Sequence, residues 1–174
     1  MSPGRMCWQM VDWSVGLSIE FDQSIDSVLS SRSFENRKTL MDSSDAVELL
    51  SQGGVTLRKG KLGNVLVVDT RSAELQPAEQ VDSWAAATGQ LPKVRELYLT
   101  GQPVADHHVS RLIDALPGLQ VLDLEGTLVT DAIFEDVVKL SKLKMLVLTK
   151  TSVSETTVRD YRKRMIQTRI VKLD

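Results

Sequence analysis

The chain has few of the residues that build specialised sites. Its 174 residues include one cysteine and two histidines, and aromatic residues make up 5%. The single Cys7 excludes an internal disulfide and fits a reducing compartment, so we expect a cytoplasmic location. No run approaches the roughly 18 apolar residues of a membrane-spanning helix. The formal net charge of -2 gives no general attraction to nucleic acid or to an anionic membrane.

Sequence motifs for catalysis, cofactors and metals are also missing. His107 and His108 are adjacent, so on a helix they point about 100° apart and do not chelate as an i, i+4 pair would. No glycine-rich phosphate loop and no nucleophile elbow occurs. The basic residues within 159–169 are explained by a solvated helix end, and Asp123 and Glu125 by solvated strand positions. We therefore predict a protein that is not an enzyme and has no cofactor, no metal and no nucleic-acid or membrane partner.

What the chain does contain is a repeated pattern. The first clear copy reads Leu116-x-x-Leu119-x-x-Leu122-x-Leu124-x-x-Thr127-x-Val129. The same frame restarts at Leu140 and runs to Val153. Seven spaced positions must match for this to happen, which indicates a structural repeat rather than chance.

Further copies of the frame begin near Lys59, Leu91 and Met165. In this frame the equivalent strand positions are Val65, Leu97, Leu122, Leu146 and Val171, with steps of 32, 25, 24 and 25 residues. Helical spacing of apolar residues follows each strand, and polar caps are expected at Asp106, at Thr130-Asp131 and at Ser154. One strand–loop–helix unit cannot bury its apolar side alone, whereas stacked units bury a continuous core.

These repeats resemble bacterial leucine-rich repeats of the LxxLxLxxTxVTD type, related to the ribonuclease-inhibitor-like class. The stretch LDLEGTLVTDAIFEDVVKLSKLKML carries the resemblance best. It implies an α/β fold, a short solenoid with a parallel sheet on its concave side and helices on its convex side. The usual Asn or Cys of the loop is replaced by Thr127, Thr151 and Gln102, and we expect the Thr hydroxyls to bond loop backbone instead. The resemblance covers residues 42–174, with an opening helix and a closing unit.

Residues 1–41 lie outside the resemblance. Apolar residues alternate strictly with polar ones from Val11 to Phe21, which predicts a β-strand at 11–21, and a short helix is expected after it. Two interpretations stay open for this N-terminal extension. It is either a loosely ordered extension or a cap that covers the repeat units, or it is a docking strand for a partner.

The repeat frame also predicts which strand side chains face the concave surface. An apolar patch there, next to Tyr98, indicates a binding surface for a protein partner, since exposed apolar patches commonly mark such sites. We therefore expect a non-enzymatic protein-interaction module. The alternative is a structural subunit or assembly factor that docks into a larger complex through its N-terminal strand. The candidate partner-binding residues are Glu96, Tyr98, Val121, Asp123, Met145, Val147, Ile170 and Lys172.

Overall fold

The structure of the protein is a computed structural model and describes residues 42–73 and 78–173. The chain divides into two compact parts, residues 1–39 and 40–174, and all described residues belong to the second part. The strand predicted at 11–21 and the helix predicted after it lie outside the described residues.

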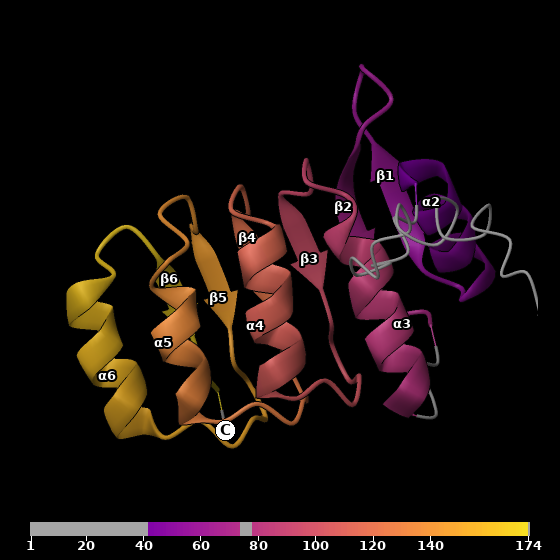
Figure 1. Cartoon of the computed structure of the whole chain (residues 1–174). Coiled ribbons are helices and arrows are strands. Elements are labelled where there is room, and N and C mark those ends of the chain that lie inside the picture. Colours follow the sequence, from indigo (N-terminus) through magenta and orange to yellow (C-terminus); the bar gives the residue numbers. More distant parts are fainter. Residues whose placement is uncertain (1–41, 74–77, 174) are drawn as a thin grey trace, which may run out of the picture. The chain divides into compact units, whose positions relative to one another are not determined.

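The described residues form a mixed α/β structure built on one six-stranded sheet, which confirms the predicted α/β class. The strands follow the order of the sequence across the sheet (Figure 1). The strands are β1 (Thr56–Lys59), β2 (Val65–Asp69), β3 (Glu96–Tyr98), β4 (Val121–Asp123), β5 (Met145–Val147) and β6 (Arg169–Val171). The helices are α2 (Ser43–Gln52), α3 (Ala78–Gly89), α4 (Asp106–Ala115), the 3-10 turn η1 (Asp131–Ile133), α5 (Phe134–Val137) and α6 (Glu155–Arg164).

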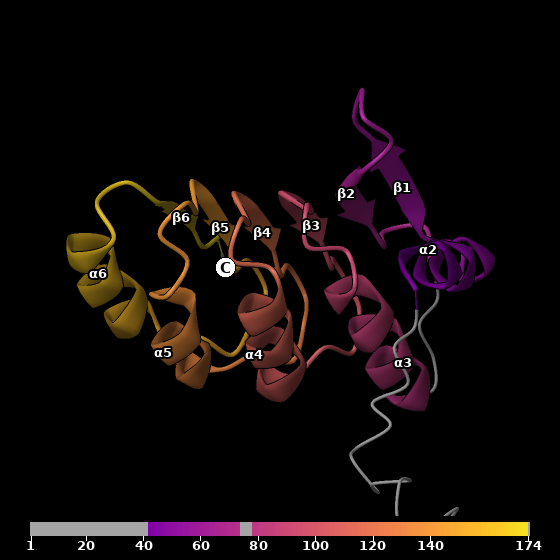
Figure 2. The same ribbon diagram turned by 45° about the horizontal axis from the view of Figure 1, so that its top comes forward.

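Strands β2 to β6 are parallel, and β1 pairs with β2 in the antiparallel sense. Each parallel connection passes through a helix. Figures 1 and 2 show α3, α4, α5 and α6 side by side along one face of the sheet. That arrangement buries the apolar side of every unit against its own strand and against its neighbours.

The core lies between the sheet and these helices. Leu97, Leu122, Leu146 and Ile170 face each other in register across β3 to β6, and each is at most 5% exposed. They recur at intervals of 25, 24 and 24 residues. Phe134 belongs to the same buried core and stacks on Tyr161 of α6, with ring centroids 4.3 Å apart.

The two ends of the sheet correct the predicted frame. Val68, not Val65, is paired with Leu97. The prediction was wrong here because the run Val65–Val68 is apolar throughout, so the repeat frame fits it equally well three residues later. In β6, Ile170 rather than Val171 is paired with Leu146. Ile170 and Val171 are both apolar, so the sequence leaves two frames open, and the 5% exposure of Ile170 identifies it as the core residue.

The loops after the strands are held by side chains at the predicted threonine positions. The hydroxyls of Thr127 and Thr151 donate to the carbonyls of Leu124 and Leu148 at 2.8 and 2.7 Å, which confirms the expected bonds to loop backbone. The buried Gln102 instead reaches the preceding unit.

Two of the three predicted helix caps are confirmed. The Thr130 hydroxyl accepts from the Ala132 amide and the Ser154 hydroxyl from the Thr157 amide. Asp106 does not cap its own helix, since Ala105 occupies that position. Its carboxylate accepts from the amide and hydroxyl of Thr130 at 2.8 and 2.7 Å, and so links two successive units.

Candidate interaction surface

Side chains of β3 to β6 that point away from the helices form two rows, which we call the outer face of the sheet. The first row contains Glu96, Val121, Met145 and Arg169. The second row contains Tyr98, Asp123, Val147 and Val171. Neighbouring strands in a sheet lie about 4.8 Å apart, so each row is a continuous line of side chains.

Six of the eight predicted surface residues lie in these rows, and two do not. Ile170 is buried in the core row of β6, and Lys172 follows the end of that strand. Arg169 and Val171 take their places on the outer face because β6 is shifted by one residue from the predicted frame. A shift of one residue exchanges the two faces of a strand.

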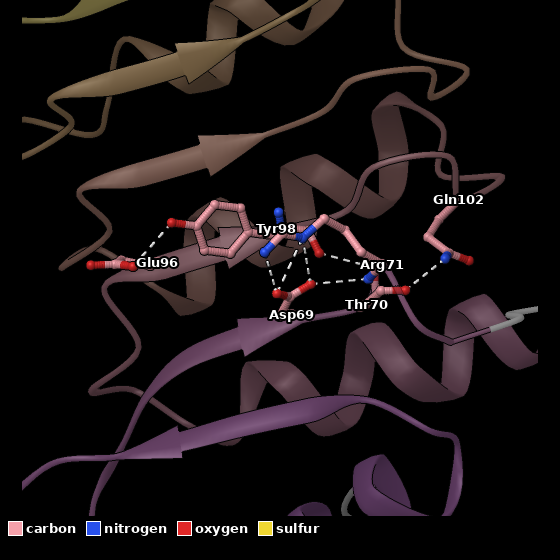
Figure 3. A network of polar contacts seen from close by, with 6 residues as sticks. All are labelled: Asp69, Thr70, Arg71, Glu96, Tyr98 and Gln102. Carbon is pink, nitrogen blue, oxygen red and sulfur yellow. Dashed lines mark hydrogen bonds and ion pairs between the residues drawn. The ribbon is translucent and has the colours of Figure 1, made fainter.

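A charged network lies over β3 and the neighbouring β2, at one end of the outer face (Figure 3). The Arg71 guanidinium donates to both carboxylate oxygens of Asp69, with Nη2 2.6 Å from Oδ2 and Nε 3.0 Å from Oδ1. The same guanidinium lies over the Tyr98 ring, 4.9 Å from its centroid, within the range of a cation–π interaction. The Tyr98 hydroxyl donates to Glu96 Oε2 at 3.1 Å. These contacts fix residues of two neighbouring strands, β2 and β3, and of the loop after β2 against one another.

The pKa values of Asp69 and Tyr98 are shifted in the directions expected for an ion-pair network. The hydrogen bond from Arg71 lowers the pKa of the Asp69 carboxyl and outweighs the effect of its burial. Burial raises the pKa of the Tyr98 hydroxyl, and the hydrogen bond to Glu96 raises it further. Asp69 is thus held ionised and Tyr98 is held protonated, which suits fixed charges and donors better than a pair that exchanges protons.

The predicted surface omitted Asp69 and Arg71. Asp69 was missed because the frame placed on β2 was three residues early. Arg71 follows the strand, and its position over Tyr98 depends on a contact between two units that sequence spacing does not reveal. The signal that was available is the Asp69-x-Arg71 spacing, which allows a carboxylate to bind a guanidinium two residues later.

On β4 to β6 the outer face is mainly apolar, and its charged members there are Asp123 and Arg169. Val121, Met145, Val147 and Val171 form a contiguous patch across three strands, which we call the apolar patch. Met145 is 36% exposed and the valines are half-buried. An ion pair between Lys150 and Glu125, 3.1 Å long, flanks the strand ends above it. An apolar centre with a charged margin is the usual anatomy of a protein–protein interface.

A second cluster brings together Asp82 of α3 with His107 and His108 of α4, whose possible ligand atoms lie within 4.8 Å of one another. Asp82 lies 25 residues before His107 in the sequence and reaches the histidines through the packing of α3 on α4. The amide of Ala105 donates to Nδ1 of His108 at 3.1 Å. A neutral His108 therefore carries its proton on Nε2, which faces Asp82 Oδ1 at 3.5 Å.

That arrangement suits a tie between two helices better than a metal site. A metal bound through Nε2 of His108 needs a free lone pair on that nitrogen. The hydrogen bond that Nδ1 accepts favours the tautomer with a proton on Nε2, which leaves no lone pair there. Arg111 also donates to Asp82 at 2.9 Å and places a positive charge beside the carboxylate. Burial lowers the pKa of His108, and the neighbouring His107 lowers it further, so the neutral form is favoured.

Comparison of the chain with models of known protein families and with curated protein sequences finds no match. Among the described residues, no helix has the length and apolar character needed to cross a membrane. The case for function therefore depends on the outer face.

Proposed function

We propose that residues 42–174 are a leucine-rich-repeat solenoid that serves as a non-enzymatic protein-interaction module. The partner is a protein that binds the outer face. The observation that carries the proposal is the adjacency, on one sheet face, of the apolar patch and the Asp69–Arg71–Tyr98 network.

The two parts of this surface have different roles in the proposed complex. The apolar patch supplies the affinity, since its side chains lose their remaining contact with water when a partner covers them. The charged network supplies orientation. Arg71 and Asp69 already hold each other in place, so little side-chain entropy is lost when a partner hydrogen-bonds to them.

The test is a binding experiment with a matched pair of single substitutions in the full chain. Met145→Lys places a charge in the apolar patch, and Val138→Lys places the same charge on the helix side, at an apolar residue that is 45% exposed. Partners are captured from a native extract, identified, and then measured as purified proteins. We expect Met145→Lys to weaken the purified complex at least about tenfold and Val138→Lys to leave it unchanged.

Equal binding by both variants would remove the outer face from consideration. Loss of the partner on deleting residues 1–41, with full binding by Met145→Lys, would favour the alternative function of docking through the N-terminal segment. Circular dichroism and urea unfolding of each variant show whether its fold is intact.

A further inference from the structure

Cations gather at the edge of the sheet where the parallel strands begin, which we call the amino edge. Each comes from the β1–β2 hairpin, from a loop that leads into a strand or, for Arg169, from the first position of β6. They are Lys59, Lys61, Lys93, Arg95, Lys142, Lys144 and Arg169, and all seven are exposed. Backbone bonds align these loops. The Gln120 amide donates to Arg95, and the Lys144 amide to Gln120, each at 2.7 Å.

The amino edge carries a net positive charge, although Glu96 occupies in β3 the position of Arg169 in β6 and places a carboxylate among these cations. Within residues 42–73 and 78–173, every ion pair lies elsewhere and involves none of these seven cations. Asp69, Asp123 and Glu125 lie at the opposite edge, where the strands end. At that edge Arg71 pairs with Asp69 and Lys150 with Glu125. The small overall charge of the protein therefore conceals a concentration of positive charge at the amino edge, and a cluster of like charges attracts an oppositely charged partner.

A groove runs along the amino edge. It has a volume of about 660 Å³, and its lining includes Lys61, Leu62, Lys93, Arg95, Pro117 and Lys142. The β1–β2 hairpin projects beyond the starts of the other strands and forms one wall (Figure 1). Leu62 near the hairpin tip is 90% exposed. The groove thus offers cations and apolar walls together.

We propose that this groove binds an acidic polypeptide segment with apolar residues between its carboxylates. Lys93 and Lys142 lie on loops two strands apart, which corresponds to about 10 Å. An extended polyproline-like segment places every third side chain on one side at a spacing of about 9 Å. Carboxylates at every third position therefore match the two lysines, while the residues between them contact Leu62 and Pro117.

The groove favours a polypeptide over other polyanions. Single-stranded nucleic acid binds where bases stack on aromatic side chains, and the groove lining contains none. A lipid surface is broad and flat, whereas the cations that line the groove stand around a hollow. The surface is separate from the apolar patch, so the inference does not depend on the function proposed above.

The experiment measures fluorescence anisotropy of a labelled peptide of four Glu-Leu-Ser repeats titrated with the full-length protein. The edge variant is Lys93→Glu with Lys142→Glu. The control variant is Lys163→Glu with Arg159→Glu, which makes the same charge change on the exposed face of α6. We expect the edge variant to weaken binding at least about tenfold, the control to stay within about twofold, and salt to weaken the wild-type complex.

A third variant, Leu62→Ser, tests the apolar wall and is expected to weaken binding severalfold. The same titration is made with a peptide of Lys-Leu-Ser repeats, with an oligothymidylate and with vesicles of equal parts phosphatidylserine and phosphatidylcholine. Absence of binding to the acidic peptide, or equal binding by the edge variant, would overturn the proposal. Tighter binding of the oligothymidylate or the vesicles than of the acidic peptide would also overturn it.

Discussion

Gln102 joins two successive units through a pair of buried hydrogen bonds. Its amide nitrogen donates to the carbonyls of Thr70 and Ala73 at 2.9 and 2.7 Å (Figure 3 shows the first). Gln102 is 6% exposed, so water has little access to its side chain. Replacing Gln102 by Leu keeps most of its volume and removes both donors.

The two carbonyls are affected differently by this change. The Thr70 carbonyl also accepts from the Ala73 amide at 2.9 Å and keeps that bond, so its loss is about 1 kcal/mol. Ala73 is 6% exposed, and leaving its carbonyl without the Gln102 donor costs about 1–3 kcal/mol. We therefore expect Gln102→Leu to lower the free energy of unfolding by about 2–4 kcal/mol.

Urea unfolding followed by tryptophan fluorescence measures this loss, since the buried Trp84 lies in the core of the same region. Gln102→Glu provides a sharper test. Two carbonyls facing the carboxylate raise its folded pKa, so this variant is most stable below the unfolded pKa of about 4.3 and loses stability as the pH rises towards 7. A loss below about 0.5 kcal/mol for Gln102→Leu, or no pH dependence for Gln102→Glu relative to wild type, would refute the reasoning.

Two further predictions concern other links between units. The lowered pKa of buried His108 means that stability is fully present above its unfolded pKa of about 6.5 and declines on acidification, by at most about 1.4 kcal/mol per pH unit. Urea unfolding between pH 8 and pH 5 should show this dependence in wild type and in His107→Gln, and a flatter one in His108→Gln. The same slope in all three would contradict the assignment. Asp131 accepts from the Ser154 amide at 2.7 Å. Asp131→Ala should therefore cost about 1 kcal/mol by thermal unfolding, whereas Asp160→Ala on the exposed side of α6 should cost less than about 0.5 kcal/mol. Equal effects of these two substitutions would count against the link.

The middle of the sheet could be predicted from the sequence, and its ends could not. Around Leu122 and Leu146 each buried residue is separated from the next by a polar or half-buried one, so only one frame satisfies the core. Around Val68 and Ile170 apolar residues are adjacent, and several frames are equally good locally. What decides between them is burial against a neighbouring unit, which is a property of the folded chain.

Contacts between units explain the other differences. Asp82 and His108 belong to different helices, and only the packing of α3 on α4 brings them to 3.5 Å. The position of Arg71 over Tyr98 likewise arises from two strands that are neighbours in space. The repeat frame predicted the residues of the apolar patch on β4 and β5, because there the alternation along each strand determines the face.

One feature of β6 bears on how far the sheet can grow. Arg169 and Val171 direct their hydrogen bonds towards β5, so the intervening Ile170 directs its carbonyl outwards. Arg162 of α6 donates two hydrogen bonds to that carbonyl, with Nη2 2.9 Å and Nε 3.3 Å from the oxygen. A chain approaching this edge would have to displace a guanidinium before it could add a seventh strand. The last helix thus protects the exposed margin of the sheet against edge-to-edge aggregation, a hazard of every open sheet.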